Sequence, residues 1–268
     1  MNNIIKGFIL FSVAVALFFA TSCCTGNPEP APPPSGSLNF EFKHKINGES
    51  IIFDTLMYTN DAGNVYMVNE IQYFISDVTI YTMDGKSYLL NSWNDIHYID
   101  TDISDTKTYT FKDEIPVGTY NKISFTFGIN EQKNNSLMFV NPPESFMFWP
   151  EQLGGGYHYM KLNGKWINEL NQISPFNFHL GIGQIYQSFP DSISEFIQNY
   201  FTVDMIDGDF VIKENNTTTL DLVMNVENWF RNPNTYNHNF WGGDIMQKQD
   251  AMHQAVENGH DVFSYSAE

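Results

Sequence analysis

The chain has 268 residues, of which 42% are hydrophobic and 16% aromatic, and its formal net charge is −18 at pH 7. An acidic field of this size repels phosphate backbones, which excludes nucleic acid as a partner. The 23 Phe and 14 Tyr residues supply enough apolar area for one large core, so we predict a single folded domain over residues 38–268.

The N-terminus is typical of a secreted lipoprotein. Lys6 is followed by an apolar stretch from Gly7 to Ala20, which is too short for a stable transmembrane span. The small residues just before Cys23 resemble a bacterial lipobox, in which the cysteine is acylated and becomes the mature N-terminus. We therefore predict a signal peptide over residues 1–22 and a membrane anchor at Cys23, in the periplasm or at the outer-membrane surface.

Residues 23–37 are predicted to form a proline-rich linker. Five prolines lie between Pro28 and Pro34, and such a stretch forms a stiff, extended spacer. The two cysteines of the chain, Cys23 and Cys24, both precede this stretch. The domain therefore has neither a disulfide nor a thiol nucleophile, and its stability depends on its core.

Alternating apolar and polar residues predict strands through most of the domain. In the stretch from Leu38 to Ile46, every second residue is apolar apart from His44, which shares the inward face. Many short strands separated by turn signals predict an all-β fold, an antiparallel β-sandwich. Further strands are expected at 65–82, 87–100, 108–113, 122–129, 157–164 and 175–182, with a hairpin over 209–226 that turns at Asn215 and Asn216.

Two segments have the pattern of short helices. Residues 190–201 could open a helix at Asp191 or Ser192. Residues 243–259 predict a C-terminal helix that is capped by Asp244 and stops at Gly259, with an apolar stripe that packs on the sandwich.

Enzyme signatures are absent from the sequence. It contains no G-x-S-x-G, no H-E-x-x-H, no P-loop and no Rossmann glycine pattern, so we predict that the protein is not an enzyme. The acidic stretch with Asp100, Asp102 and Asp105 lacks the glycine and glutamate of a hand-type calcium loop, because Asp105 and Phe111 occupy those positions. A solvated acidic loop is the simpler interpretation.

Another group of residues has the chemistry of a metal site. His158 follows three consecutive glycines, and Met147 and Trp149 lie just upstream. Imidazole, thioether and indole groups suit a soft or borderline ion such as copper better than calcium or magnesium, which prefer oxygen. Imidazoles must be neutral to bind a metal, so binding should weaken below about pH 6.

Four stretches, in this order and spacing, resemble the MbnP-like family of bacterial secreted copper-binding domains, which are associated with methanobactin and also occur as lipoproteins. They are FEFKHKINGE; NEIQYFISDVTIY with IPVGTYNKISFTFGIN; MFWPEQLGGGYHYMKLNGKW; and FNFHLGIG. The resemblance implies a β-sandwich in which two histidines bind copper, with a tryptophan that in some members is oxidised to kynurenine. Carried over to this chain, it implies His44, His179 and Trp149 as the metal site. His158 and Met147, which the donor chemistry above indicates, are additional candidates.

The sequence departs from the family pattern in the segment that carries Trp149. Where the family commonly has a tryptophan-rich run followed by G-Y and an acidic residue before a glycine, this chain has one tryptophan in WPEQLGGGY and then Asn163 before Gly164. Oxidation of the tryptophan would also require a diheme oxidase as a partner, about which the sequence carries no information.

The residues leave two other interpretations open. A surface module that binds glycans or proteins without metal would use exposed aromatic residues such as Trp93 or Trp241 for stacking. A scaffold lipoprotein could also keep the fold and have lost the metal.

Overall fold

The computed structural model describes residues 32–92 and 94–267. The predicted signal peptide, Cys23 and Trp93 lie outside the described residues. Residues Pro34–Glu268 form one compact unit. No helix within 32–92 and 94–267 combines the length and apolar character needed to cross a membrane.

The first of two sheets is built around β1 (Ser35–Ile46). This strand pairs in parallel with β16 (Thr217–Asn225), which pairs in turn with the antiparallel β17 (Phe263–Ala267). Three short antiparallel strands complete the sheet along β1: β2 (Glu49–Ser50), β7 (Thr108–Thr110) and β8 (Ile115–Pro116).

The second sheet is antiparallel and follows the order β11-β10-β4-β9-β14. These strands span Ile173–Leu180, Met160–Ile167, Val65–Thr82, Gly118–Phe127 and Phe201–Met205 respectively. Shorter strands extend it: β3 (Tyr58–Thr59), β5 (Ser87–Leu89) and β6 (Ile96–Asp100) pair with β4, and β15 (Phe210–Ile212) pairs with β9.

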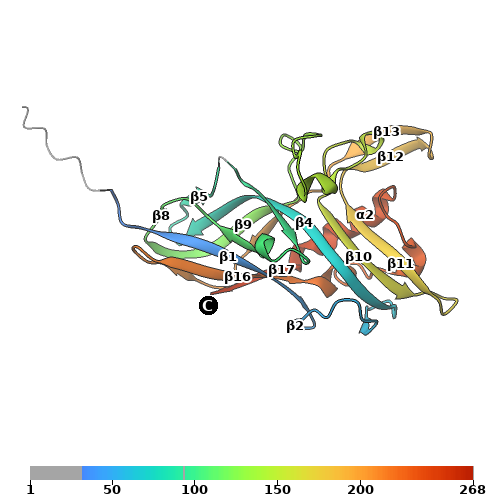
Figure 1. Cartoon of the computed structure of the whole chain (residues 1–268), viewed down its shortest axis with the longest axis horizontal. Coiled ribbons are helices and arrows are strands. Elements are labelled where there is room, and N and C mark those ends of the chain that lie inside the picture. Colours follow the sequence, from blue (N-terminus) through green and yellow to red (C-terminus); the bar gives the residue numbers. More distant parts are fainter. Residues whose placement is uncertain (1–31, 93, 268) are drawn as a thin grey trace, which may run out of the picture. The chain divides into compact units, whose positions relative to one another are not determined.

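The core lies between the two sheets, with β1, β16 and β17 facing β4 and β9 in Figure 1. The alternation predicted for β1 is confirmed, because Leu38, Phe40, Phe42 and Ile46 are buried together with His44. Burying the apolar face of each sheet against the other removes both from water, which is what stabilises a sandwich without disulfides. The all-β prediction is therefore correct.

Two local predictions were wrong. Residues 190–201 are not helical: β13 (Ser192–Ile197) pairs with β12 (Gly183–Ser188) in a separate hairpin. The chain does turn at Asn215, but β15 and β16 belong to different sheets and do not form a hairpin ladder. β13 pairs with the strand immediately before it, whereas β15 and β16 pair with strands far away in the sequence, so strand pairing outside each segment overrode its local pattern.

The C-terminal helix is present but shorter than predicted. Helix α2 spans Gln249–Asn258, is followed by Gly259, and buries Ala251 and Met252. Asp244 does not cap it; its carboxylate accepts from the backbone N–H of Met246 within a preceding turn. The other helical pieces are short: α1 (His238–Trp241), η1 (Ser104–Lys107), η2 (Glu144–Met147), η3 (Glu151–Leu153), η4 (Val226–Phe230) and η5 (Gly259–Asp261).

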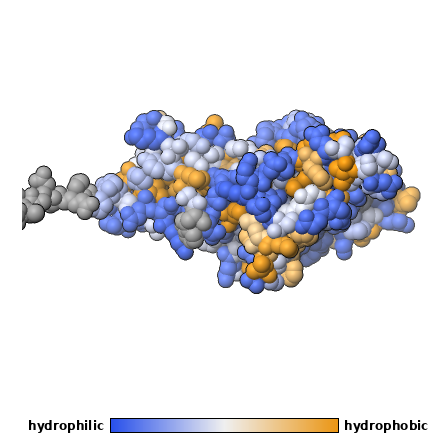
Figure 2. Space-filling model, turned by 90° about the horizontal axis from the view of Figure 1, so that it is seen from above, coloured by the Kyte–Doolittle hydropathy of each residue, from blue (hydrophilic) through white to orange (hydrophobic). Residues whose placement is uncertain are grey.

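A long connection, residues 128–159, joins β9 to β10 and lies on the same side of the molecule as the β12–β13 hairpin (Figure 1). Figure 2 looks down on this side, where hydrophilic side chains predominate and hydrophobic ones form patches. The connection itself exposes several apolar side chains, including Leu137, Val140 and Phe146.

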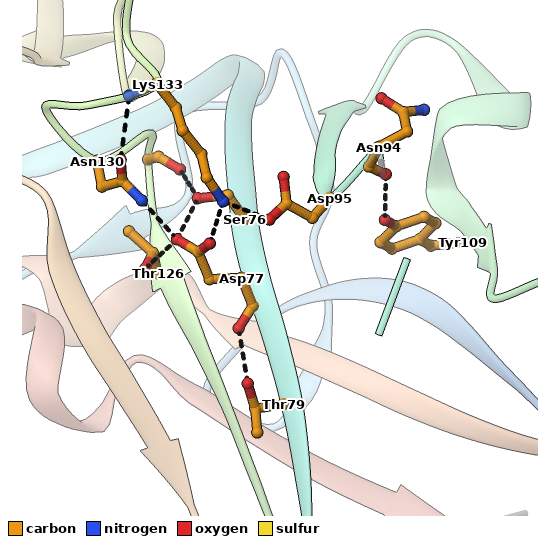
Figure 3. Close-up of polar contacts among 10 residues, drawn as sticks. Ser76, Asp77, Thr79, Asn94, Asp95, Tyr109, Thr126, Asn130 and Lys133 are labelled. Carbon is orange, nitrogen blue, oxygen red and sulfur yellow. Dashed lines mark hydrogen bonds and ion pairs between the residues drawn. The ribbon is translucent and has the colours of Figure 1, made fainter. Parts of the chain in front are cut away.

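An ion-pair cluster fixes the start of this connection (Figure 3). The ammonium of Lys133 contacts both Asp77 and Asp95. Asp77 also accepts hydrogen bonds from Thr126 at 3.0 Å and Asn130 at 2.9 Å. Because these charges are partly buried and mutually paired, the cluster holds the beginning of the connection against β4.

Candidate metal centre

The register of three strands decides which side of the second sheet each candidate faces. Leu180 of β11 lies opposite Met160 of β10, which lies opposite Tyr73 of β4, and all three are fully buried in the core. Adjacent residues on a strand point to opposite faces. His179 and its cross-strand neighbour Lys161 therefore lie on the outer face, away from the centre of the sandwich.

His179 is oriented by an amide and a carboxylate on the neighbouring strands. Its Nε2 lies 2.8 Å from Oδ1 of Asn163, and Nδ2 of Asn163 donates to the carboxylate of Glu70 at 3.1 Å. The carboxylate fixes the amide so that its oxygen faces the imidazole, and the proton of His179 is therefore on Nε2. The other ring nitrogen, Nδ1, is buried and has no hydrogen-bond partner.

His158 has a complementary arrangement. Its Nδ1 donates to the backbone carbonyl of Met147 at 2.9 Å, and its backbone N–H donates to the same carbonyl at 2.7 Å. Its Nε2 is buried without a partner. The rings of His158 and His179 meet edge to face, with centroids 5.1 Å apart. Two unshared nitrogen lone pairs are thus buried side by side, in a fold that pairs most other buried polar atoms.

Burial keeps both imidazoles neutral. It lowers the pKa of His179 to about 3, with a smaller contribution from the positive charge of Lys161. It also lowers the pKa of His158 well below its ordinary value, helped by His179 and Lys161. Neutral imidazole is the form that binds metal ions, so the onset of acid weakening expected near pH 6 moves to lower pH at this site.

Trp149 forms one wall of the same site. Its ring meets that of His158 edge to face at 4.6 Å, and its Nε1 donates to the carbonyl of Leu153 at 3.0 Å. A side chain at position 181 would exclude it, since a Cβ on Gly181 would lie 2.5 Å from the indole Cε3. Glycine two residues after His179 thus lets the fully buried indole reach the imidazole pair.

The three glycines before Tyr157 form the turn that leads into His158. Gly154, Gly155 and Gly156 all have positive φ, a conformation that residues with side chains rarely adopt. The turn is held by the long connection: Gly156 donates to the hydroxyl of Ser136 at 2.8 Å. The site therefore combines two strands with a turn that the connection supports.

Met147 contributes its backbone to the site. Its carbonyl accepts the two hydrogen bonds from His158 described above, whereas its side chain is fully buried in a separate cluster with Phe74, Tyr98, Ile129 and Tyr157. The thioether, which the sequence suggests as an additional ligand, lies within this cluster.

His44 is not part of this site, contrary to the sequence-based expectation. Its ring lies 5.8 Å from that of Tyr73, which is on the inner face of the second sheet. His179 is on the outer face of that sheet. Burial lowers the pKa of His44 to about 4, with a smaller contribution from Lys107. The resemblance indicated a histidine that is buried on a strand, as a ligand could be. His44 faces the core, however, whereas His179 is on the outer face of the second sheet.

Sequence reasoning missed Asn163 and Glu70 as the groups that orient His179. Asn163 had been noted only as a departure from the family pattern. A hairpin centred near residue 170 places Lys161 opposite His179, and this spacing was the available signal that residues near 158 and 179 meet. Glu70 comes from β4, and no local pattern connects it to either histidine.

The acidic stretch near residue 100 lies beside the residues that orient His179, because Glu70 belongs to both groups. Glu70, Asp100 and Asp102 place one carboxylate oxygen each within 4.8 Å of one another, and Asp105 is not among them. Asp100 accepts hydrogen bonds from Tyr98 at 2.7 Å and Gln72 at 3.0 Å. Glycan binding by exposed aromatic residues stays a prediction. Of the two tryptophans considered for it, Trp241 is half-buried, and its indole N–H donates to Gln254.

Comparison with known proteins identifies the relatives of this fold. No curated protein sequence matches the chain. The structure matches that of MbnP from Methylosinus trichosporium with a TM-score of 0.56 and 14% sequence identity, covering 87% of this chain and 99% of the other. This similarity concerns the fold. The family model described as MbnP matches residues 35–248, a span that holds both sheets' central strands and the imidazole pair, so the chain belongs to the MbnP family.

Proposed function

We propose that this protein binds one copper ion between His158 and His179 and is a binding protein without catalytic turnover. The observation that supports this proposal most directly is the pair of buried, unpartnered nitrogens, Nε2 of His158 and Nδ1 of His179, on rings 5.1 Å apart. Bonds of about 2 Å between metal and imidazole nitrogen are compatible with this ring separation.

Each imidazole is prepared for a metal in the way that metal-ligating histidines usually are. The N–H of one donates to a backbone carbonyl and that of the other to an amide backed by a carboxylate. Such partners fix the tautomer and the ring orientation, so that the free lone pair points toward the ion. A bound copper ion would accept both lone pairs.

The donor set favours copper over harder ions. Neutral imidazoles suit copper and zinc, whereas calcium and magnesium require oxygen ligands, and among divalent ions copper binds nitrogen sites most strongly. Membership of a family associated with methanobactin and copper supports the same choice. Trp149 would close one side of the site, and its conversion to kynurenine, which requires a partner oxidase, remains an expectation of the family resemblance.

The experiment is a metal titration of the purified protein with matched variants. We expect one copper per chain in the wild type, and a loss of at least about 100-fold in affinity in His158→Ala and in His179→Ala, because one of two ligands is removed. His44→Leu serves as the control and should keep full affinity. Loss of copper in His44→Leu, with normal binding in the other two variants, would refute this assignment. Peptide mass mapping over Trp149 in protein from the native host reports its oxidation state.

We also propose that the mature protein is anchored in the bacterial envelope through acylated Cys23. The lipobox-like residues before it support this proposal. Fractionation of cells should recover the protein with membranes, and its N-terminal peptide should carry the mass of the lipid. Recovery of an unmodified soluble chain would count against the anchor.

A further inference from the structure

A hollow of about 280 Å³ lies between the β12–β13 hairpin and the start of helix α2. It is lined by residues 184–186 of β12, by Trp241 of α1 and by residues 247–250, which lead into α2. Gln247 donates to the hydroxyl of Tyr186 at 2.9 Å, so the two walls are joined at one edge. Pockets for drug-sized ligands begin at about 300 Å³, and this hollow therefore suits a smaller ligand of one or two rings.

Two aromatic side chains of this lining, Trp241 and Tyr186, are half-buried. The indole of Trp241 is stacked on the ring of Tyr236 with centroids 6.5 Å apart, and its Nε1 donates to Gln254 at 2.7 Å. These contacts fix the indole in place, so a ligand that packs on it does not have to order the side chain. A fixed indole beside a hollow offers an apolar surface to another ring, such as the C–H face of a sugar.

Gln184 brings an unused hydrogen-bond acceptor to the lining. The residue is 2% exposed, and its Nε2 donates to the backbone carbonyl of Leu153 at 3.0 Å and to that of Ile182. Because the two carbonyls hold the amide nitrogen, they fix the orientation of the amide, and Oε1 is left buried without a partner. Leaving such an oxygen unpaired costs free energy, which a hydroxyl donated by a ligand would recover.

The start of α2 brings unused donors to the same hollow. Lys248, at the N-cap position, provides no side-chain cap, so the first N–H groups of the helix lack a side-chain acceptor. The ammonium of Lys248 donates to the carbonyl of Trp241, and Asp250 lines the hollow as well. One positive and one negative side chain thus offset each other locally, while the net charge of −18 on the whole chain repels anions.

We propose that this hollow binds a neutral saccharide of one or two rings. Sugar hydroxyls both donate and accept, so one ligand can supply a donor to Oε1 of Gln184 and acceptors to the first N–H groups of α2. The face of its ring packs on Trp241 at the same time. An anion would supply acceptors alone, and an apolar ligand would supply neither. The inference adds glycan binding to metal binding, and it does not rest on the copper site proposed above.

The test titrates the purified protein with cellobiose, maltose and diacetylchitobiose by isothermal calorimetry, and we expect at least one of them to bind once per chain. Trp241→Ala should lose about tenfold in affinity, because the surface on which the sugar ring packs is removed. Gln247→Ala, at an exposed position on the rim, should lose about threefold, the effect of one hydrogen bond. Phe240→Ala is the matched control: this aromatic neighbour of Trp241 is 74% exposed and outside the lining, and its loss should leave binding unchanged.

A blank result with the three disaccharides and on an array of neutral glycans would overturn the inference. Tighter binding of cellobiuronic acid than of cellobiose would also overturn it, because the site would then select an anion. Sugar binding that neither Trp241→Ala nor Gln247→Ala weakens would place the ligand elsewhere, with the same consequence. If Trp241→Ala does not fold, as judged by circular dichroism, Gln247→Ala decides the question alone. Copper titration of the same variants should match the wild type, so the two proposals can fail separately.

Discussion

Among the described residues, buried ring nitrogens without hydrogen-bond partners belong to His44, to the pair on the outer face and to His238. The outer-face pair and His238 differ in what surrounds the rings. The pair on the outer face, His158 and His179, was described above. The other is His238 of α1, which is fully buried and whose two ring nitrogens both lack hydrogen-bond partners. Its ring packs against Phe176 at 4.4 Å and Tyr236 at 5.0 Å between centroids. Burial lowers the pKa of His238 to about 3, as it does that of His179.

The comparison shows that burial and a lowered pKa do not identify a metal ligand. His238 shares both properties with His179, but the rings that pack against it belong to tyrosine, tryptophan and phenylalanine residues, and none of them is an imidazole. At the outer-face pair, each ring has one N–H fixed by an acceptor and one buried nitrogen without a partner, and the neighbouring ring is a second imidazole. The acceptor and the second ligand, not the exclusion of water, are what distinguish the site.

The largest effect that would sharpen this comparison is expected from Asn163→Ala. It removes the acceptor of the His179 N–H, so the imidazole can change tautomer and rotate, and loss of such a group typically costs about 10- to 100-fold in metal affinity. Copper titration measures it. Asn177→Ala, at the exposed position opposite Asn163 on β11, is the control and should bind normally. Equal affinities in the two variants would show that the amide does not orient the ligand.

Gly181→Ala should have an intermediate effect, on the wall of the site. The added Cβ would lie 2.5 Å from Trp149, so the indole or the strand end must move. Overpacking of this kind costs about 1–3 kcal/mol, and we expect a lower midpoint of urea unfolding together with a changed tryptophan fluorescence spectrum. Gly118→Ala is the control for glycine replacement, because a Cβ there would meet nothing within 4 Å and the backbone does not have a positive φ. An unshifted spectrum in Gly181→Ala would show that Trp149 is not positioned by this glycine.

The smallest effect is a pH dependence at the second place. Because the pKa of His238 is lowered to about 3 in the folded state, the unfolded state binds more protons below about pH 6.5, and stability falls as the pH is lowered from there. His238→Phe removes this contribution. Between pH 7 and pH 5.5 the variant should therefore lose about 1 kcal/mol less of its unfolding free energy than the wild type does.

Urea unfolding at the two pH values measures this difference. Phe176→Leu disturbs the same ring cluster without a titratable group and should show the pH dependence of the wild type. Identical pH dependence in His238→Phe and the wild type would mean that the ring is protonated or solvated in the folded protein. The comparison between the two places would then no longer hold.

Much of the fold and part of the site could be predicted from local sequence. The alternation in β1 predicts that His44 is inward, as observed. The sequence around His179 also alternates, and the structure buries Phe178 and Leu180 on the face opposite His179. Family motifs indicated Trp149 and His179, and the glycines indicated the turn before His158. These features depend on residues that are near neighbours in the sequence, so their signal survives without the structure.

Tertiary structure decided that His158 and His179 are the histidines whose rings lie together. Sequence determined that this protein is a sandwich of alternating strands with buried imidazoles. It could not determine which of these imidazoles share a side of a sheet, because a shift of one residue in register moves a side chain to the opposite face. The pairing of β10 with β4 and β11 brought Glu70, Asn163 and His179 together and left His44 inside the core.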